Sequence, residues 1–260
     1  MIRISYINAA GETVSAASHE TEVHLCTETD YGEGDMLVIN CTPCSHLWVQ
    51  MDAALMPGEI YSPTGIIKWR VPYGHDRDAY SPAVSVPGRH AVSARIMSQD
   101  EIRSRRNIAC NPSDLRGDVD FYPHCTANVE TRGEALFAAR NVIDGYRINS
   151  GHWGWPYQSW GIGGRDDACC TIDFGREVEI DEMAIVIRAD FPHDAWWSQG
   201  QVVLSDGDVI DFPLTKTADR QFISLGPHRV SWMRLQNLKQ DPSADGFPAL
   251  TEWEVYGRDV

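Results

Sequence analysis

The sequence has few lysines and little positive charge. Its 260 residues include 22 Lys and Arg against 37 Asp and Glu, which gives a formal net charge of −15, and its only lysines are Lys68, Lys216 and Lys239. Nucleic-acid backbones and anionic membranes bind basic surfaces. We therefore expect neither a nucleic acid nor a membrane to be a partner of this protein.

Long apolar runs are also missing. No stretch of 18 apolar residues occurs, and the first residues contain no apolar segment of signal-peptide length. Segments of these kinds indicate a membrane span or export. We therefore expect a cytoplasmic protein.

Motifs of disulfide scaffolds, zinc sites and common enzymes are absent as well. The seven cysteines are odd in number and irregularly spaced, and the Cys41–Cys44 pair has no second CxxC to complete a zinc site. The sequence also contains no GxSxG nucleophile motif. These absences favour a protein without catalytic residues.

Most of the sequence consists of short runs that are rich in β-branched residues or alternate between apolar and polar residues. Turns rich in Gly, Pro and Asp separate these runs. This pattern predicts an all-β protein of two β-sandwich domains, residues 1–105 and 106–260, with a charged helical connector at residues 97–106. The expected strands are residues 22–26, 36–40, 46–51, 65–71 and 90–96 in the first domain, and 170–174, 182–188, 201–205, 209–212, 221–225, 230–235 and 251–256 in the second.

Several motifs of the second half follow one another in a familiar order. They are residues 107–109 with 124–127, 139–145 (Ala-Arg-Asn-Val-Ile-Asp-Gly), Trp160 with 170–175, 180–187, 230–235 and 250–257 (Leu-Thr-Glu-Trp-Glu-Val-Tyr-Gly). In this order they resemble the galactose-binding-like fold of the discoidin or coagulation-factor type C family, which includes the family 32 carbohydrate-binding modules. The resemblance implies a jelly-roll sandwich over about residues 106–258 and, in most members, a non-catalytic role.

An Asp-Gly turn follows an apolar pair at residues 142–145. A carboxylate and several carbonyls in one tight turn suit calcium, which prefers oxygen ligands. The resemblance implies a structural Ca²⁺ held by the side chains of Asp144 and Glu252, carbonyls of Asn141, Tyr146 and Thr251, and either Asn149 or Ser150. The alternative is that Asp144 only caps a turn and Glu252 is a surface strand residue.

Five of the nine tryptophans fall between Trp153 and Trp197. Two loops in this region combine aromatic rings with Arg, Asp and His, which suits the apolar faces and hydroxyl rims of sugars. The expected carbohydrate-binding residues are His152, Trp153, Trp155, Arg188, Asp190, His193, Asp194, Trp196 and Trp197. We expect Trp160, Trp232 and Trp253 to lie in the core.

The sequence thus predicts a non-catalytic carbohydrate-binding protein, with a homo-oligomer as a possible assembly. Two alternatives stay open. One is a glycan-active hydrolase or lyase that uses Asp190, His193 and Asp194. The other is a protein–protein scaffold in which the Trp loops are buried.

Overall fold

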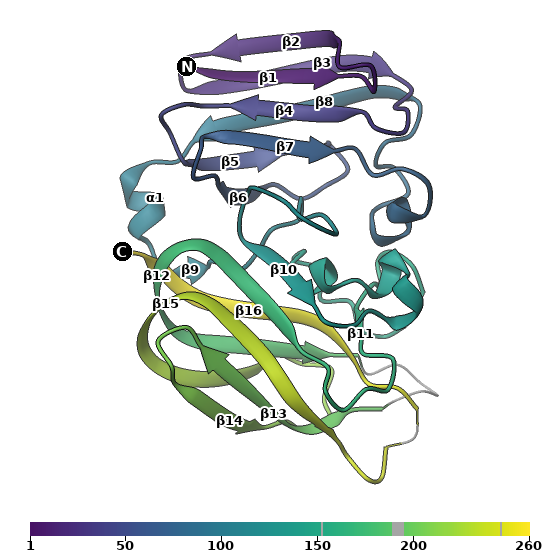
Figure 1. Cartoon of the computed structure of the whole chain (residues 1–260), viewed down its shortest axis with the longest axis vertical. Coiled ribbons are helices and arrows are strands. Elements are labelled where there is room, and N and C mark those ends of the chain that lie inside the picture. The colour runs from purple at the N-terminus through teal and green to yellow at the C-terminus, as the bar shows by residue number, and fades with distance from the viewer. Residues whose placement is uncertain (152, 189–194, 245) are drawn as a thin grey trace.

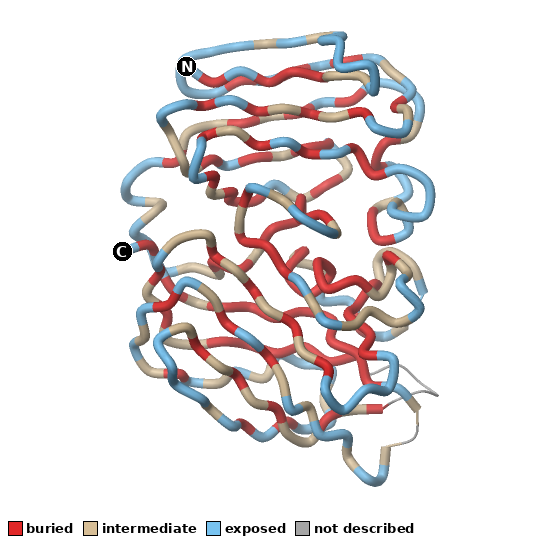
Figure 2. Tube along the Cα trace, viewed as in Figure 1, coloured by how far each residue is buried: buried red, intermediate tan, exposed pale blue. Residues whose placement is uncertain are grey.

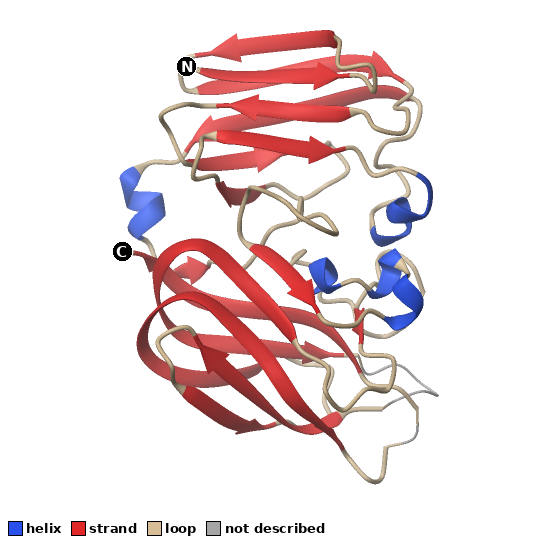
Figure 3. Ribbon diagram, viewed as in Figure 1, coloured by secondary structure: helices blue, strands red, loops and turns tan. Residues whose placement is uncertain are grey.

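The computed structural model describes residues 1–151, 153–188, 195–244 and 246–260. Strands dominate the described chain, and its few short helices lie near the junction of the two halves (Figure 3). The all-β prediction is therefore confirmed. None of the described helices has the length and apolar character needed to cross a bilayer.

The N-terminal half is a sandwich of two four-stranded antiparallel sheets (Figure 1). The first sheet contains, in spatial order, β2 (Thr13–His19), β1 (Ile2–Ile7), β4 (Met36–Asn40) and β7 (Ile66–Arg70). The second contains β3 (Glu22–Thr29), β8 (Gly88–Ile96), β5 (His46–Gln50) and β6 (Gly58–Tyr61).

Alternation along these strands places every second side chain in the core. In β3 the buried positions are Val23, Leu25 and Thr27, and in β4 they are Leu37 and Ile39. Strands β1, β2 and β6 were not among the expected strands. The segment that forms β2, Thr-Val-Ser-Ala-Ala-Ser-His, is mostly small and polar and has no fully buried residue, so it carries little hydrophobic signal.

The C-terminal half is a single antiparallel sheet that folds around a second core. Its main path runs β11 (Trp160–Gly161), β16 (Ala249–Asp259), β12 (Cys170–Ile187), β15 (Gln221–Gln240), β13 (Trp197–Leu204) and β14 (Val209–Pro213). Two short strands join it: β10 (His124–Ala127) pairs with β12, and β9 (Arg106–Asn107) pairs with β16.

Strands β12 and β15 are 18 and 20 residues long and curve strongly (Figure 1). Each replaces two separate strands of the prediction, so the expected breaks within them were wrong. The register between the two strands shifts after Asp173 and again after Ile180. These irregularities let one continuous strand bend around the core where the sequence alone indicates a break.

The short helices are α1 (Gln99–Arg103) and the 3₁₀ turns η1 (Gly74–Ala79), η2 (Thr131–Gly133), η3 (Ala135–Phe137) and η4 (Ala139–Val142). Helix α1 lies within the expected connector. It begins with a capping box, in which the Ser98 hydroxyl and the Glu101 carboxylate accept hydrogen bonds from each other's backbone N–H groups.

The segment after β9 packs on both cores. Leu115, Phe121 and Ala135 join the N-terminal hydrophobic cluster, whereas Ile108 and Cys125 belong to the C-terminal one. Buried positions therefore continue across the junction between the two halves (Figure 2). A domain boundary near residue 106 stays a prediction.

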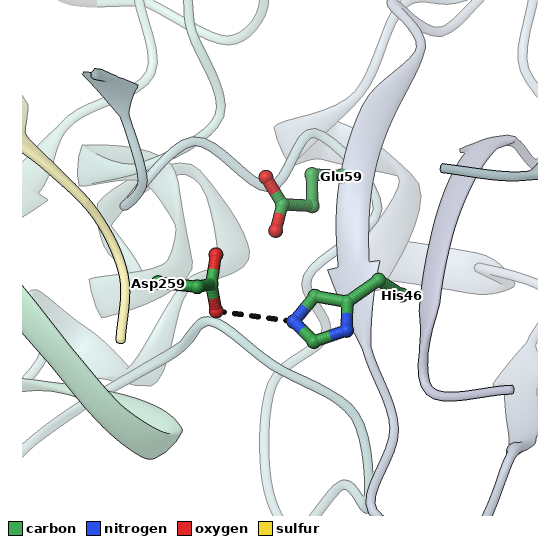
Figure 4. A group of neighbouring side chains, drawn as sticks. All are labelled: His46, Glu59 and Asp259. Carbon is green, nitrogen blue, oxygen red and sulfur yellow. Dashed lines mark hydrogen bonds and ion pairs between the residues drawn. The ribbon is translucent and has the colours of Figure 1, made fainter. Parts of the chain in front are cut away.

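A cluster of charged side chains joins the two halves. Arg106 donates to Glu59 Oε2 at 2.6 Å and to Asp259 Oδ2 at 2.7 Å. Arg176 donates to the same two carboxylates, and His46 Nε2 lies 3.0 Å from Asp259 Oδ1 (Figure 4). Burial by itself would raise the pKa of Asp259, but hydrogen bonds from His46, Arg176 and Arg106 outweigh it and hold that pKa well below its usual range.

We expect Asp259→Asn to lower the free energy of unfolding at pH 7 by about 3 kcal/mol, because the variant removes the negative charge that pairs with Arg106 and Arg176. The folded-state pKa of Asp259 lies below the unfolded value of about 3.9, so its contribution is complete above that pH and decreases as the pH falls below it. Urea unfolding at pH 7 and pH 3 should show a smaller difference between wild type and variant at pH 3.

Asp181→Asn is the matched control, because Asp181 pairs with Arg105 while both side chains are about half exposed. We expect this variant to change stability by no more than about 0.5 kcal/mol. Equal losses in the two variants at pH 7 would show that the buried cluster does not join the two halves.

Candidate functional site

A hollow of 1130 Å³ lies at one end of the C-terminal sandwich. Its walls come from loops at the ends of strands, which include the η2–η3 segment, the turn after β11, the end of β12 and the loop before β16. We call it the Trp153–Phe247 hollow. The residues of its lining that matter below are Arg132, Glu134, Phe137, Trp153, Arg188 and Phe247.

Two large aromatic side chains of this hollow are unusually exposed. Trp153 is 71% and Phe247 70% exposed. A Cβ placed on Gly164 would lie 3.6 Å from Phe247 Cε1, so the Phe247 ring lies against the backbone of this turn. Gly164 also has a φ of +72°, which favours glycine. The hollow therefore offers apolar faces to a ligand.

Charged groups lie beside these rings. Arg132 donates from Nε to Glu134 Oε1 at 2.5 Å and from Nη2 to Glu134 Oε2 at 2.8 Å, and its guanidinium lies 5.2 Å from the centre of the Phe137 ring. The hydrogen bonds from Arg132 lower the pKa of Glu134. Arg188 is buried and donates from Nη2 to the Phe247 carbonyl at 3.0 Å.

The backbone of Arg132 adopts φ = +54°, a left-handed conformation that is uncommon for a residue with a side chain. Residues held in this way concentrate at binding sites, where surrounding contacts over-determine them. The guanidinium of this residue contacts Glu134 and the Phe137 ring. The hollow thus combines aromatic faces with planar donors and a carboxylate acceptor.

The structure brings only some of the expected sugar-binding residues together. Trp153 and Arg188 line the Trp153–Phe247 hollow, and Trp155 lines a neighbouring one. Trp196 is half-buried against the C-terminal core. His152, Asp190, His193 and Asp194 lie outside the described residues.

The assignment of Trp197 to ligand binding was wrong. Trp197 begins β13, pairs with Gln240 and is only 1% exposed within the C-terminal core. Of two adjacent residues in a strand, one faces the core and the other faces away, and here Trp197 is the inward one. Trp160 and Trp253 are fully buried as expected, whereas Trp232 is only half-buried.

Sequence reasoning missed Arg132, Glu134, Phe137 and Phe247. Phe247 lies between Gly246 and Pro248, so it has the same turn-bounded aromatic signature that indicated the Trp loops. The segment containing Arg132 and Glu134 forms the short helical turns η2 and η3. Nothing in the local sequence shows that this segment faces Phe247.

A second group of functional interest surrounds the expected calcium loop. Asp144 and Glu252 are 1% and 0% exposed. The Asp144 carboxylate accepts hydrogen bonds from Tyr146 N and Gln158 Nε2, both at 2.9 Å, and lies 3.4 Å from Arg140 Nη1. Glu252 accepts from Gly145 N at 3.2 Å on both oxygens. Glu252 is therefore not a surface strand residue.

Both carboxyl groups of this pair have raised pKa values. Burial raises the pKa of Asp144, against the lowering effect of Arg140. Burial, with the nearby charges of Asp144 and Glu254, raises the pKa of Glu252 well above its ordinary value. Asp144 has the buried guanidinium of Arg140 as its ion-pair partner, whereas Glu252 has the Gly145 N–H group and the charge of Arg147. The raised pKa values favour the neutral form of both carboxyl groups.

Some side-chain oxygens of neighbouring residues are buried without a hydrogen-bond partner among the described residues. They are Gln158 Oε1, Ser159 Oγ and Thr251 Oγ1. Calcium takes six to eight oxygen ligands, mixing carboxylates with neutral oxygens. Asn149 is buried and Ser150 exposed, which favours Asn149 of the two alternatives, although the Asn149 amide nitrogen already donates to the Ile187 and Ala218 carbonyls.

No family model matches this chain, and no curated protein matches it. The family 32 carbohydrate-binding module of C. perfringens NanJ, solved with galactose, is 15% identical over 51% of this chain and 91% of its own, with a TM-score of 0.39. The lectin domain of lectinolysin, solved with Lewis B antigen, is 17% identical over 60% and 98%, with a TM-score of 0.44.

Chitosan-binding module 1 of a chitosanase/glucanase from Paenibacillus sp. IK-5 is 19% identical over 58% of this chain and 99% of its own, with a TM-score of 0.40. At such identities a likeness concerns the fold alone, and with all three TM-scores below 0.5 it adds no argument about this chain.

The two tryptophan environments predict effects of very different size on the free energy of unfolding. Trp197→Ala should lower the free energy of unfolding by about 3–5 kcal/mol, because it empties a large volume of the core. Trp153→Ala should change it by about 0.5 kcal/mol or less, because that side chain is mostly exposed. Urea unfolding followed by far-UV circular dichroism measures both, and a large loss for Trp153→Ala would contradict the placement of Trp153 at the surface of the hollow.

Proposed function

We propose that this protein is a non-catalytic carbohydrate-binding protein and that its sugar binds in the Trp153–Phe247 hollow. The observation that carries the proposal is the exposure of Trp153 and Phe247 in one hollow that also holds Arg188 and the Arg132–Glu134 pair. Exposed aromatic rings cost hydration free energy unless a ligand covers them. The family resemblance of residues 106–258 supports the same function.

The chemistry of a pyranose suits this arrangement. One face of the ring presents C–H groups, which pack on an indole or phenyl ring, while the hydroxyl groups around the rim need donors and acceptors. Glu134 is an acceptor, and the Arg132 guanidinium is a planar donor with N–H groups beyond the two that Glu134 accepts. The Arg132–Glu134 pair holds its own geometry before a sugar arrives, which reduces the entropy lost on binding.

We expect Trp153→Ala to weaken binding of the best ligand found on a glycan array by about tenfold or more, because stacking on an exposed aromatic anchor dominates such sites. Isothermal titration calorimetry measures the loss. Trp48→Ala is the matched control, since Trp48 is a partly exposed tryptophan on β5 that lies outside the hollow.

Two results would contradict the proposal. One is an array on which no glycan binds. The other is equal affinity of wild type, Trp48→Ala and Trp153→Ala for the same glycan.

The glycan-hydrolase or lyase alternative depends on Asp190, His193 and Asp194, which lie outside the described residues, so it stays a prediction. The scaffold alternative requires buried Trp loops, and the exposure of Trp153 favours an open site instead. A homo-oligomer and a cytoplasmic location likewise stay predictions.

We also propose that Asp144 and Glu252 hold a structural Ca²⁺, together with the carbonyls of Asn141, Tyr146 and Thr251 and the side-chain oxygen of Asn149. Two features support this: both carboxyl groups are buried although Arg140 forms an ion pair with Asp144 alone, and nearby side-chain oxygens are buried without partners, in each case among the described residues. Such an ion would order the loop from residue 141 to 149 without taking part in a reaction.

Calcium should therefore raise the melting temperature of protein that has been treated with EDTA. In Glu252→Gln we expect the melting temperature without calcium to be higher than in wild type, because a buried like charge is removed, and the response to calcium to be lost. Differential scanning calorimetry with and without 1 mM CaCl₂ measures both effects. An unchanged calcium response in Glu252→Gln would exclude Glu252 as a ligand.

A further inference from the structure

A second hollow, of 610 Å³, lies between the two halves of the chain. Its wall contains Arg77, Asp78 and Tyr80 from the η1 segment of the N-terminal half. Trp155 and Tyr157, from the C-terminal half, complete the part of the wall used below. We call it the Tyr80–Trp155 hollow.

The two hollows meet at one tryptophan. Trp153, Gly154 and Leu136 line both of them, so Trp153 forms the ridge between the Trp153–Phe247 hollow and the Tyr80–Trp155 hollow. Trp153 is 71% exposed, and a ligand lying across it would enter both spaces.

Backbone contacts hold this ridge against the N-terminal half. Trp155 N donates to the Asp78 carbonyl at 3.4 Å. A Cβ on Gly154 would lie only 3.3 Å from the same carbonyl oxygen, so this close approach favours glycine. The second hollow is therefore built by the packing of the two halves, and neither half forms it alone.

The wall of the second hollow has the same mixture of groups as the first. Trp155 and Tyr157 contribute aromatic rings, and Asp78 contributes a half-exposed carboxylate. Arg77 donates from Nη2 to the Val84 carbonyl at 3.3 Å, and its guanidinium carries further N–H groups. Aromatic faces with charged donors and acceptors again suit a sugar ring.

Size favours a chain of sugars over a single one. Pockets for small-molecule ligands typically measure about 300–1,000 Å³, and each of the two hollows, at 1130 and 610 Å³, is of that order. One monosaccharide would occupy a small part of the combined space and would contact one side of Trp153 only.

We propose that the ligand is an oligosaccharide that crosses Trp153, with sugar units in both hollows, so that the N-terminal half supplies part of the binding site. This inference rests on the proposed function and extends it from sugar binding to recognition of an extended glycan chain. Arg77 and Asp78 then bind the sugar units that lie in the Tyr80–Trp155 hollow.

Calorimetry with size-defined probes tests the inference. We titrate wild type with galactose and galactotetraose, and with N-acetylglucosamine and chitotetraose, and expect the tetrasaccharide of the recognised series to bind at least about tenfold more tightly than its monosaccharide. The double variant Arg77→Ala/Asp78→Ala should lose most of this gain and keep the monosaccharide affinity, whereas Trp153→Ala should weaken both.

The matched control is Glu28→Ala/Arg89→Ala, which removes an exposed acidic and basic pair from the N-terminal half, away from both hollows. Its affinities should equal those of wild type. Hydrogen exchange on the wild-type protein gives a readout that needs no variant: the tetrasaccharide should protect residues 74–82, and the monosaccharide should not.

Equal affinity of monosaccharide and tetrasaccharide, with residues 74–82 unprotected, would overturn the extended site while leaving sugar binding intact. A tetrasaccharide gain that Arg77→Ala/Asp78→Ala leaves unchanged would overturn the role of the N-terminal half. Absence of binding to these probes and to every glycan of the array would overturn the proposed function together with this inference.

Discussion

The buried guanidinium of Arg140 connects the parts of this molecule on which both candidate sites depend. It donates from Nε to the Asp114 carbonyl at 2.8 Å and from Nη2 to the Pro112 carbonyl at 3.0 Å, and it stacks 4.4 Å from the centre of the Tyr80 ring. Its remaining N–H groups face Asn141, Asp144 and the Ala79 carbonyl. A buried charge is tolerated only when such partners surround it, so these segments must pack together.

This packing makes the relative placement of the two halves part of the candidate site. Tyr80 lines the Tyr80–Trp155 hollow, and the η1 segment that precedes it contacts the loop containing Trp155. The ion cluster of Glu59, Arg106, Arg176 and Asp259 joins the halves at a second point. A surface shared between two sandwiches keeps its shape only if they do not rotate against each other, and two separated buried contacts provide that constraint.

Much of the fold could be predicted because strand periodicity is a local property. The expected strand at residues 36–40 coincides with β4, and the inward positions of β3 follow simple alternation. The curved strands β12 and β15 could not be predicted as single elements, because their bends follow from register shifts against neighbours distant in sequence. Trp153 and Arg188 could be predicted from the aromatic and charged residues of their own loops. Arg132, Glu134 and Phe247 could not, because only the packing of distant segments brings them to the same hollow.

The sequence by itself determined the all-β class, the order of motifs that resembles galactose-binding-like domains, and the presence of aromatic loops and an Asp-Gly turn. These are properties of spacing and residue type over a few positions. Only the tertiary structure decided that Trp197 is core while Trp153 is exposed, that Glu252 lies buried beside Asp144, and that residues 74–82 face Trp155. Burial and proximity depend on which distant segments pack together, and no local pattern specifies that.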